Sequence, residues 1–159
     1  MKQIPLTMGK EALVDDEDYE YLTQWKWRFN RHNGYAQADV RKRDKRTTVY
    51  MHSLVAQRRG LGCDKTVDHC NRKKLDNRRS NLRSATHHQQ KGNCGRRRDN
   101  TSGYRGVRWQ TREQKWQAML LVDGVGRSFG YYSDPRDAAR AYNKAAIDYF
   151  GEFAVLNPV

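Results

Sequence analysis

The residues best suited to chemistry lie in the run VDHCNRKKLDNRRSNLRSATHHQQKGN, residues 67–93. Asp68 stands directly before His69, Asn81 follows twelve residues after the histidine, and Gln90 follows nine residues later. A carboxylate binds a hard divalent cation, and an imidazole can take a proton from water near neutral pH. Asn81 can orient that imidazole through an amide hydrogen bond, and Gln90 offers a second oxygen ligand. The set predicts metal-assisted hydrolysis of a phosphodiester bond.

The charge distribution predicts the substrate. The 159-residue chain has a net charge of +13. Residues 41–98 carry 18 Lys and Arg against 4 Asp and Glu, so the excess surrounds the Asp–His motif. A basic region of this kind is the electrostatic footprint of a protein that binds the phosphate backbone. A solvated surface and a patch for acidic membranes are the alternatives, and nucleic acid is favoured over both.

The chain shows no sign of a membrane or a secretory route. No run approaches the roughly 18 apolar residues that a membrane span needs, and the first twenty residues lack an apolar signal region. We expect a cytoplasmic protein of a bacterial or phage-infected cell. Cys63, Cys70 and Cys94 are odd in number and lack a CxxC spacing, so we expect reduced thiols. A zinc site from these cysteines with His87 or His88 is the disfavoured alternative.

Short elements must hold the Asp–His run. The acidic stretch DDEDYEYLTQ predicts a helix capped by Asp15 or Asp16, and WKWRF and YAQADVRK predict a hairpin around the turn RHNG. TTVYMHSLVAQR predicts a strand that runs into a short helix, in which we expect His52 to be a packing residue with satisfied hydrogen bonds. A strand then carries the Asp–His pair, and a helix begins at His87.

The C-terminal third has a clearer pattern. YRGVRW, KWQAMLLV and RSFGYY predict three strands, and in the middle one Trp116, Ala118, Leu120 and Val122 share the face expected to be buried. DPRDAARAYNKAAIDYFG predicts one helix, with Asp134 as its cap and Gly151 at its end. These residues predict a three-stranded antiparallel sheet packed on one α-helix, with the other sheet face open.

The first block resembles the HNH endonucleases, above all the homing endonucleases of phages and introns. Asp68-His69, LDNR at residues 75–78, NLR at residues 81–83 and MHSLV at residues 51–55 carry the resemblance. It implies a ββα-metal site in which Asp68 and the last motif position bind the metal, His69 is the general base and Asn81 positions it. The family usually has Asn or His where this chain has Gln90. His87, His88 and Asn93 are therefore alternative ligands.

The second block resembles the plant ethylene-response-factor, or apetala-two, DNA-binding domain from Asn100 to about Asn157. NTSGYRGVRW, KWQAMLL and DPRDAARAYNKAAIDYFGEFAVLN carry this resemblance. It implies that the open sheet face lies in the major groove of DNA. Leu121 and Ser128 depart from the family pattern. The residues expected to contact DNA are Arg105, Arg108, Trp109, Arg112, Arg127 and the linker residues Arg96, Arg97 and Arg98.

These observations predict an α+β protein with a nuclease domain over residues 1–93, a basic linker over 94–102 and a DNA-binding domain over 103–159. We expect a site-selective endonuclease for double-stranded DNA that uses one divalent ion, most readily Mg²⁺, with Mn²⁺ as a substitute and zinc disfavoured. A monomer or a homodimer fits, and no protein partner is inferred. The main rival is a sequence-specific DNA-binding regulator with an impaired nuclease half; an RNA-binding or nucleoid protein is a third possibility.

Overall fold

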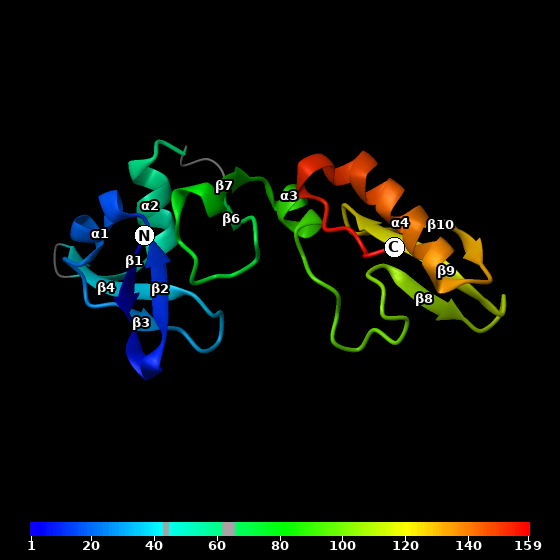
Figure 1. Cartoon of the computed structure of the whole chain (residues 1–159), viewed down its shortest axis with the longest axis horizontal. Helices are drawn as coiled ribbons and strands as arrows, with labels where there is room; N and C mark the ends of the chain where they lie inside the picture. The colour runs from blue at the N-terminus through cyan, green and yellow to red at the C-terminus, as the bar shows by residue number, and fades with distance from the viewer. Residues whose placement is uncertain (43–44, 62–65) are drawn as a thin grey trace. The chain divides into compact units, whose positions relative to one another are not determined.

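The computed structural model describes residues 1–42, 45–61 and 66–159. It divides into two compact units, Met1–Ala85 and Thr86–Val159 (Figure 1). Both units mix helices with antiparallel sheets, so the predicted mixed class is confirmed. The units divide eight residues before the predicted end of the nuclease domain at residue 93. The segment 86–93 therefore packs with the C-terminal half of the chain.

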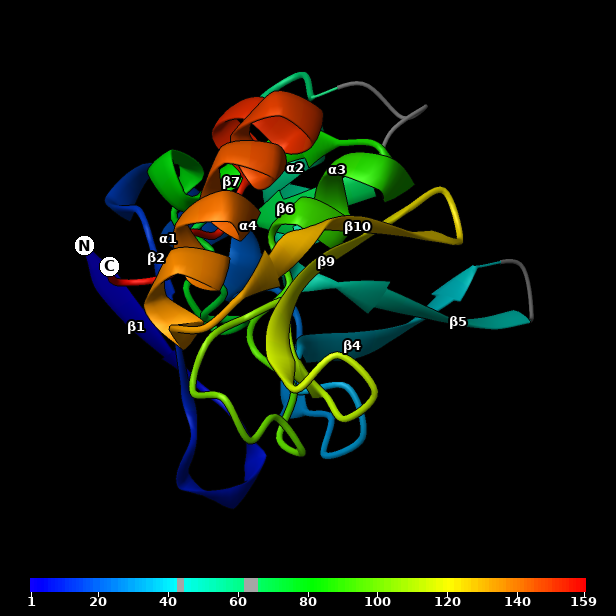
Figure 2. The same ribbon diagram turned by 90° about the vertical axis from the view of Figure 1, so that its right-hand side faces the viewer.

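The first unit contains three small antiparallel sheets. β1 (Lys2–Pro5) pairs with β2 (Glu11–Val14), and β6 (Thr66–His69) pairs with β7 (Leu82–Ala85). A three-stranded sheet has the order β3-β4-β5, and its β4–β5 hairpin is seen in Figure 2. The remaining elements of this unit are β3 (Arg28–Phe29), β4 (Ala36–Lys42), β5 (Lys45–Tyr50), the 3-10 turns η1 (Thr7–Gly9) and η2 (Arg79–Asn81), and the helices α1 (Asp16–Leu22) and α2 (Met51–Arg58).

The predicted elements of this unit form close to their expected positions, with one difference. WKWRF was expected to be a strand throughout, but only Arg28 and Phe29 pair with β4. Trp27 is instead buried, and its indole nitrogen donates to the carbonyl of Leu22 at 2.7 Å, so it closes the end of α1. The apolar core joins all parts of the unit through Ile4, Leu6, Ala12, Val14, Leu22, Trp27, Ala36, Ala38, Met51, Val55 and Leu82.

A buried carboxylate fastens the helices of the first unit. Asp18 of α1 is inaccessible to solvent and accepts from Arg58 of α2 at 3.0 Å. Arg79 of η2 donates to the same carboxylate through two nitrogens, at 2.7 and 2.8 Å. Asp15 precedes α1 and accepts from the backbone nitrogen of Arg79 at 2.7 Å. The acidic run therefore fixes the segment that leads into β7, as well as starting a helix.

The second unit is one antiparallel sheet of order β10-β9-β8 with a long helix packed against it. In β9, Ala118, Leu120 and Val122 are buried on the helix side, as the alternation predicts, and Trp116 is half-buried. Asp134 caps α4 by accepting from the backbone nitrogen of Arg136 at 2.7 Å. The elements of this unit are α3 (His87–Gly92), β8 (Val107–Gln110), β9 (Lys115–Val122), β10 (Val125–Tyr132), α4 (Pro135–Phe150) and the 3-10 turn η3 (Gly151–Phe153).

Candidate functional site

The ribbon of β6 and β7 brings the Asp–His pair together with a tightly bonded loop. In its register Asp68 lies opposite Arg83 and His69 lies opposite Leu82. The loop that joins the two strands is closed at its base, where the backbone nitrogen of Cys70 donates to the carbonyl of Asn81 at 2.9 Å. The ribbon thus presents consecutive acidic and imidazole side chains at the end of a strand, as the sequence predicts.

His69 is buried, with 4% of its surface exposed, and its Nε2 lies 3.2 Å from Oδ1 of Asn77. The Asn77 amide nitrogen faces the carbonyl of Leu75 and the sulfur of Met51, so the amide oxygen is the atom that faces His69. An oxygen accepts, so Nε2 of His69 carries the proton and Nδ1 carries the lone pair. Nδ1 is therefore the nitrogen that can take a proton.

The surroundings of His69 favour its neutral form. Burial lowers the pKa of His69, and it outweighs the opposite effects of the Asn77 hydrogen bond and of the Asp68 and Asp76 charges. A histidine whose pKa lies below its ordinary value is uncharged at neutral pH. Its ring can then accept a proton, which is the requirement for a general base.

The asparagine that contacts His69 is Asn77, and not Asn81 as the sequence predicted. Asn81 was expected to orient His69, but its side-chain oxygen accepts from the backbone nitrogen of Asn71 at 2.9 Å. Its amide nitrogen donates to the carbonyl of Asp76 at 2.7 Å. Asn81 therefore closes the loop, and the amide that contacts His69 belongs to Asn77. Both residues are buried, and both are asparagines a few positions after His69, so the sequence could not separate them.

Asp76 completes the loop. Arg78 donates to its two carboxylate oxygens at 2.7 and 2.6 Å, and Asn71 donates to it at 2.8 Å. The backbone of Asn77 is tied to β2, because its nitrogen donates to the carbonyl of Leu13 at 2.8 Å. These bonds fix the backbone of Asn77, and so they place its side chain against His69.

Asp68, the predicted metal ligand, forms an ion pair with Arg83 at 3.0 Å and is 12% exposed. The other predicted ligand, Gln90, lies on α3 in the second unit, so its pairing with Asp68 stays a prediction. Mg²⁺ is commonly held by one or two carboxylates, with substrate phosphate and water in its other positions. The donor chemistry of Asp68 with an amide oxygen fits that pattern.

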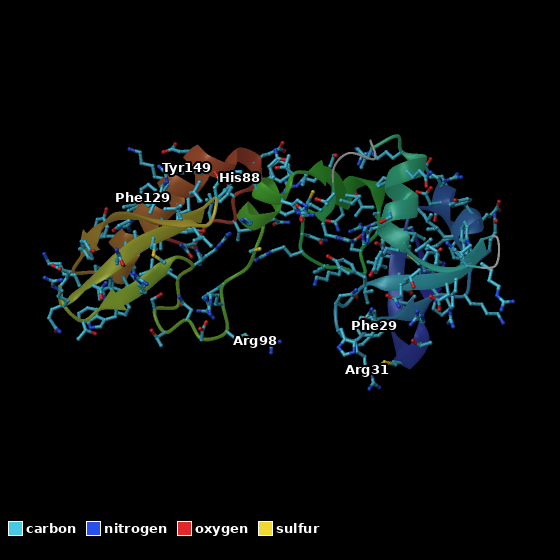
Figure 3. The ribbon with its side chains drawn as sticks, turned by 180° about the vertical axis from the view of Figure 1, so that it is seen from behind. Phe29, Arg31, His88, Arg98, Phe129 and Tyr149 are labelled. Carbon is cyan, nitrogen blue, oxygen red and sulfur yellow. The ribbon has the colours of Figure 1, made fainter. Side chains whose placement is uncertain are left out.

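The alternative third ligands also lie in the second unit, on or beside α3. Thr86 begins this helix with a capping box that it shares with Gln89. Nδ1 of His88 lies 3.0 Å from the Asp123 carboxylate and its Nε2 lies 3.2 Å from the carbonyl of Tyr149, so both ring nitrogens are engaged (Figure 3). His87 is exposed, and Asn93 is buried at the end of the helix.

The cysteines do not assemble a metal cluster in the part of the chain that the structure describes. Cys70 and Cys94 are exposed thiols, one in each unit, and Cys63 lies outside the described residues. Over residues 1–42, 45–61 and 66–159, no group of three or more His, Cys, Asp or Glu side chains is placed to hold an ion. Among those same residues no helix combines the length and apolar composition that a bilayer span requires.

An aromatic cluster beside His69 was not anticipated from the sequence. His52 was expected to be a packing residue with satisfied hydrogen bonds, but its Nδ1 is buried and has no hydrogen-bond partner within the described residues. Burial, with a smaller effect of His69, lowers the pKa of His52 to about 4, so its ring is neutral at physiological pH. The rings of Tyr35 and His52 contact that of His69, and the Tyr50 ring contacts both of them.

Arg105, predicted to contact DNA, is held inside the second unit. Its guanidinium donates to the carbonyl of Gly92 at 2.6 Å and to that of Lys91 at 2.8 Å. Its backbone nitrogen donates to the Asn157 side chain at 2.7 Å. These bonds fasten the C-terminal end of α3 to the start of β8. They give Arg105 a structural role and count against the predicted base contact.

The other predicted DNA contacts are more accessible. Arg108 is exposed on the open sheet face, where it donates to Gln117 at 2.9 Å. Gln117 in turn donates to the hydroxyls of Ser128 at 2.8 Å and Tyr131 at 3.2 Å, so one hydrogen-bonded row crosses all three strands. Trp109 is 41% exposed, with its ring centroid 5.1 Å from that of Trp116.

The remaining predicted arginines lie on the surface of the second unit. Arg112 is exposed in the turn between β8 and β9, and Arg127 donates to the Tyr149 hydroxyl at 3.1 Å. In the linker, Arg96 donates to the carbonyl of Gly103 and Arg97 pairs with Asp99. Arg98 projects away from the ribbon into solvent (Figure 3).

Comparison with known proteins adds one relative. Over 151 residues, which are 95% of this chain and 76% of the relative, the chain is 28% identical to an uncharacterized HNH endonuclease of Acanthamoeba polyphaga mimivirus. The similarity supports an HNH nuclease. No family model matches the chain, and no solved structure matches it significantly. The apetala-two resemblance of the second unit has no support from these comparisons.

Proposed function

We propose that this protein is a divalent-metal-dependent DNA endonuclease of the homing type, with His69 as its general base. One observation carries the proposal. A buried, neutral histidine is oriented by an asparagine and stands beside an aspartate at the end of a strand. The similarity to an HNH endonuclease extends over nearly the whole chain and supports the same assignment. The net charge of +13 supports a polyanionic substrate.

His69 acts through Nδ1 in this proposal. The side-chain oxygen of Asn77 accepts a hydrogen bond from Nε2–H of His69 and fixes the ring. The lone pair on Nδ1 is then directed at the attacking water. The proton passes from water to Nδ1 as the new phosphorus–oxygen bond forms, and the phosphorus–oxygen bond to the 3′ oxygen breaks as that oxygen takes a proton from solvent. The products are a 5′-phosphate and a 3′-hydroxyl, as the family resemblance implies.

Asp68 and Gln90 are the proposed protein ligands of one Mg²⁺ ion, for which Mn²⁺ can substitute. The ion supplies neutralisation of the charge that develops on the phosphate and stabilisation of the leaving oxygen. Arg83 orients Asp68 in this proposal, because its Nε donates to one carboxylate oxygen at 3.0 Å. One carboxylate oxygen of Asp68 would bind the ion, and Arg83 would keep its contact with the other carboxylate oxygen.

The second unit is the proposed reader of double-stranded DNA, of the ethylene-response-factor or apetala-two type. The open sheet face offers Arg108 and the polar row behind it to base edges, and a β-sheet can enter the major groove. Arg96, Arg97 and Arg98 are proposed to contact phosphates, and Arg112 in the turn between β8 and β9 is a further proposed contact. Trp109, beside Trp116, and Arg127, bonded to Tyr149 of α4, lie on the helix side of the sheet and are proposed contacts outside the open face. One such nuclease site cuts one strand, so a monomer nicks and a homodimer cuts both strands.

A DNA-binding regulator with an impaired nuclease half is the second candidate, favoured by two observations. The Asp68 carboxylate is already paired with Arg83, and Gln90 replaces the family's usual Asn or His. If the ion pair with Arg83 keeps Asp68 from binding metal, the protein binds DNA without cutting it.

The deciding experiment is cleavage of supercoiled plasmid and of genomic DNA with Mg²⁺ or Mn²⁺. The native protein is compared with His69→Ala, with an EDTA control and with His32→Ala as the matched control, because His32 is exposed in a turn far along the chain from the site. Metal-dependent products that His69→Ala loses and His32→Ala retains support the nuclease. Tight duplex binding without cleavage by the native protein rejects the nuclease and leaves the regulator.

A further inference from the structure

The candidate base, His69, is one of four aromatic rings that form one contact network. His69 contacts Tyr35 with ring centroids 5.7 Å apart and His52 with centroids 5.2 Å apart. Tyr35 and His52 also contact each other, at 4.8 Å. Tyr50 supports both of them, because it stacks on His52 at 5.5 Å and meets Tyr35 at 5.9 Å. The network is therefore a closed arrangement, and His69 is one member of it.

The two rings that touch His69 meet it at different angles. Tyr35 is inclined by 32° to the His69 ring, whereas His52 is inclined by 77° and so presents an edge-to-face contact. One tilted and one near-perpendicular neighbour restrict rotation of an imidazole about its Cβ–Cγ bond more than either does alone. The hydrogen bond from Nε2 to Asn77 adds a further restraint on that rotation.

The start of α2 touches both members of the His69–Asn77 pair. Met51, the first residue of the helix, accepts from the Asn77 amide nitrogen at 3.4 Å through its sulfur. His52, the next residue, contacts the ring of His69. Met51 is fully buried and belongs to the core of the first unit. The helix start is thus anchored in the core while it supports the base and the amide that orients it.

The position of the His52 ring is set by contact with its neighbours. Its Nδ1 is sealed from solvent without a hydrogen-bond partner in the described chain, so no bond to that nitrogen fixes the ring. The stacked Tyr50 ring and the tilted Tyr35 ring hold it on two sides. Tyr35 is held in turn, because Lys74 lies over its face at 4.8 Å and donates to the carbonyl of Asn33 at 2.8 Å.

From these contacts we infer that His52 is a positioning residue for His69, acting through the edge-to-face contact between the two rings. The inference rests on the proposed nuclease function, in which His69 must hold Nδ1 toward water. In that reaction His52 touches neither substrate nor metal. Its ring limits the orientations of His69 to the one that Asn77 selects.

Three variants test the inference in the full-length protein. His52→Ala removes the ring, His52→Phe keeps a planar ring without nitrogens, and His32→Ala makes the same chemical change at an exposed turn. We expect His52→Ala to lower kcat by about tenfold to a hundredfold, since small misplacements of a catalytic group have effects of that size. KM for DNA should not change. His52→Phe should restore most of kcat, and His32→Ala should match the native protein.

Each result has a definite meaning. The inference is overturned if His52→Ala cleaves DNA at the native rate. It is also overturned if folded His52→Phe is as defective as His52→Ala, because a nitrogen of His52, and not its ring, would then be required. A change confined to KM also overturns it. If the native protein itself does not cleave DNA, the proposed function fails, and the positioning is then decided by the spectroscopic experiment that follows.

Nuclear magnetic resonance of protein labelled with ¹⁵N in its histidine rings reads the orientation of His69 without DNA or metal. We expect one sharp set of His69 ring signals, with the proton on Nε2, in the native protein and in His52→Phe. In His52→Ala we expect broadened or doubled His69 signals while the backbone spectrum stays folded. Unchanged His69 signals in a folded His52→Ala would overturn the inference, whether or not the protein cleaves DNA.

Discussion

The amide oxygen of Asn77 lies 3.2 Å from Nε2 of His69, and both side chains are buried. This contact assigns to Asn77 the orienting role that the family resemblance gave to Asn81. Asn81 instead bonds the backbone on both sides of the loop. We therefore expect substitution of Asn77 to affect cleavage and substitution of Asn81 to affect stability.

We expect Asn77→Ala to lower kcat for DNA cleavage by about tenfold to a hundredfold, the range typical for loss of a residue that orients a catalytic group. Asn81→Ala removes the side chain that bonds the backbone nitrogen of Asn71 and the carbonyl of Asp76. It should lower the free energy of unfolding by about 1–3 kcal/mol for each of these two backbone groups. Cleavage rates and urea unfolding of both variants provide the check. Full activity in Asn77→Ala, with loss of activity in a stable Asn81→Ala, would restore the original assignment.

The buried carboxylate of Asp18 should be a major support of the first unit. Its removal leaves Arg58 and Arg79 without their shared partner, and breaking one side of a buried ion pair typically costs about 3–5 kcal/mol. Because both arginines retain some exposure, we expect about 2–3 kcal/mol for Asp18→Asn. Asp16→Asn is the matched control, since Asp16 pairs with the N-terminus on the exposed surface and should matter little. Similar urea midpoints for the two variants would contradict this role.

Acid should weaken the first unit through its buried carboxylates, Asp76 and Asp18. The hydrogen bond from Arg78 holds the pKa of Asp76 below its ordinary value. Burial raises the pKa of Asp18, but the bonds from Arg79 and Arg58 outweigh it and the net pKa is lowered. A lowered folded-state pKa gives stability that is present above the unfolded-state pKa of about 4 and is lost as pH falls through the folded-state pKa.

The expected result is a urea midpoint for the first unit that falls gradually below about pH 6.5, where His52 and His69 are protonated more readily in the unfolded chain, and falls further below about pH 4 as the two carboxylates are protonated. Trp25 and Trp27 report on this unit by fluorescence once Trp109 and Trp116 have been replaced by Phe. In Asp76→Asn the midpoint should start lower and fall less steeply with acid. A variant whose midpoint falls as steeply as that of the native protein would show that Asp76 carries no such linkage.

The sequence predicted the second unit best where the pattern was local. The alternation through KWQAMLLV and the cap at Asp134 depend on neighbours in the chain, and both are present in the structure. The strand that bears Asp68 and His69 also follows from local composition.

Long-range bonds were not predictable in the same way. Nothing local distinguishes Asn77 from Asn81, since their partners His69 and Asn71 are chosen by the path of the loop. Asp18 looks like one more acidic residue at a helix start until Arg79, 61 residues away in sequence, completes its pair. The contacts of His52 with Tyr35 and His69 likewise could not be predicted, because these residues come from separate parts of the chain.

Arg105 and Arg108, three residues apart, should behave differently when each is replaced by alanine. Arg105→Ala removes the donor that holds the carbonyls of Lys91 and Gly92, so the second unit should melt at a lower temperature. Arg108→Ala removes an exposed donor from the open sheet face, so it should weaken DNA binding and leave the melting temperature nearly unchanged. Fluorescence anisotropy with duplex DNA and thermal unfolding test both. If folded Arg105→Ala protein loses affinity for DNA without any loss of stability, the predicted base contact is correct.

Gly106 should be the least replaceable glycine of the second unit. A Cβ at this position would lie 2.1 Å from the Tyr142 ring and 2.7 Å from the Met119 carbonyl, and the backbone has φ +70°. Gly124 also has a positive φ, +83°, but a Cβ there meets nothing within 4 Å. Gly124→Ala should therefore cost only the left-handed backbone strain, about 1–2 kcal/mol. Gly106→Ala adds a clash between the residue before β8 and Tyr142, the largest fully buried side chain of α4, and overpacking of this kind costs about 1–3 kcal/mol more.

Hydrogen exchange of the β8 and β9 amides separates these two costs, because strain at the β9–β10 turn stays local whereas a displaced Tyr142 loosens the contact between α4 and the sheet. We expect Gly106→Ala to speed exchange across both strands and Gly124→Ala to speed it only beside the turn. Equal protection of β8 in the two variants would mean that Tyr142 can move aside without loss. In that case the close approach of Gly106 would not be what holds the helix to the sheet.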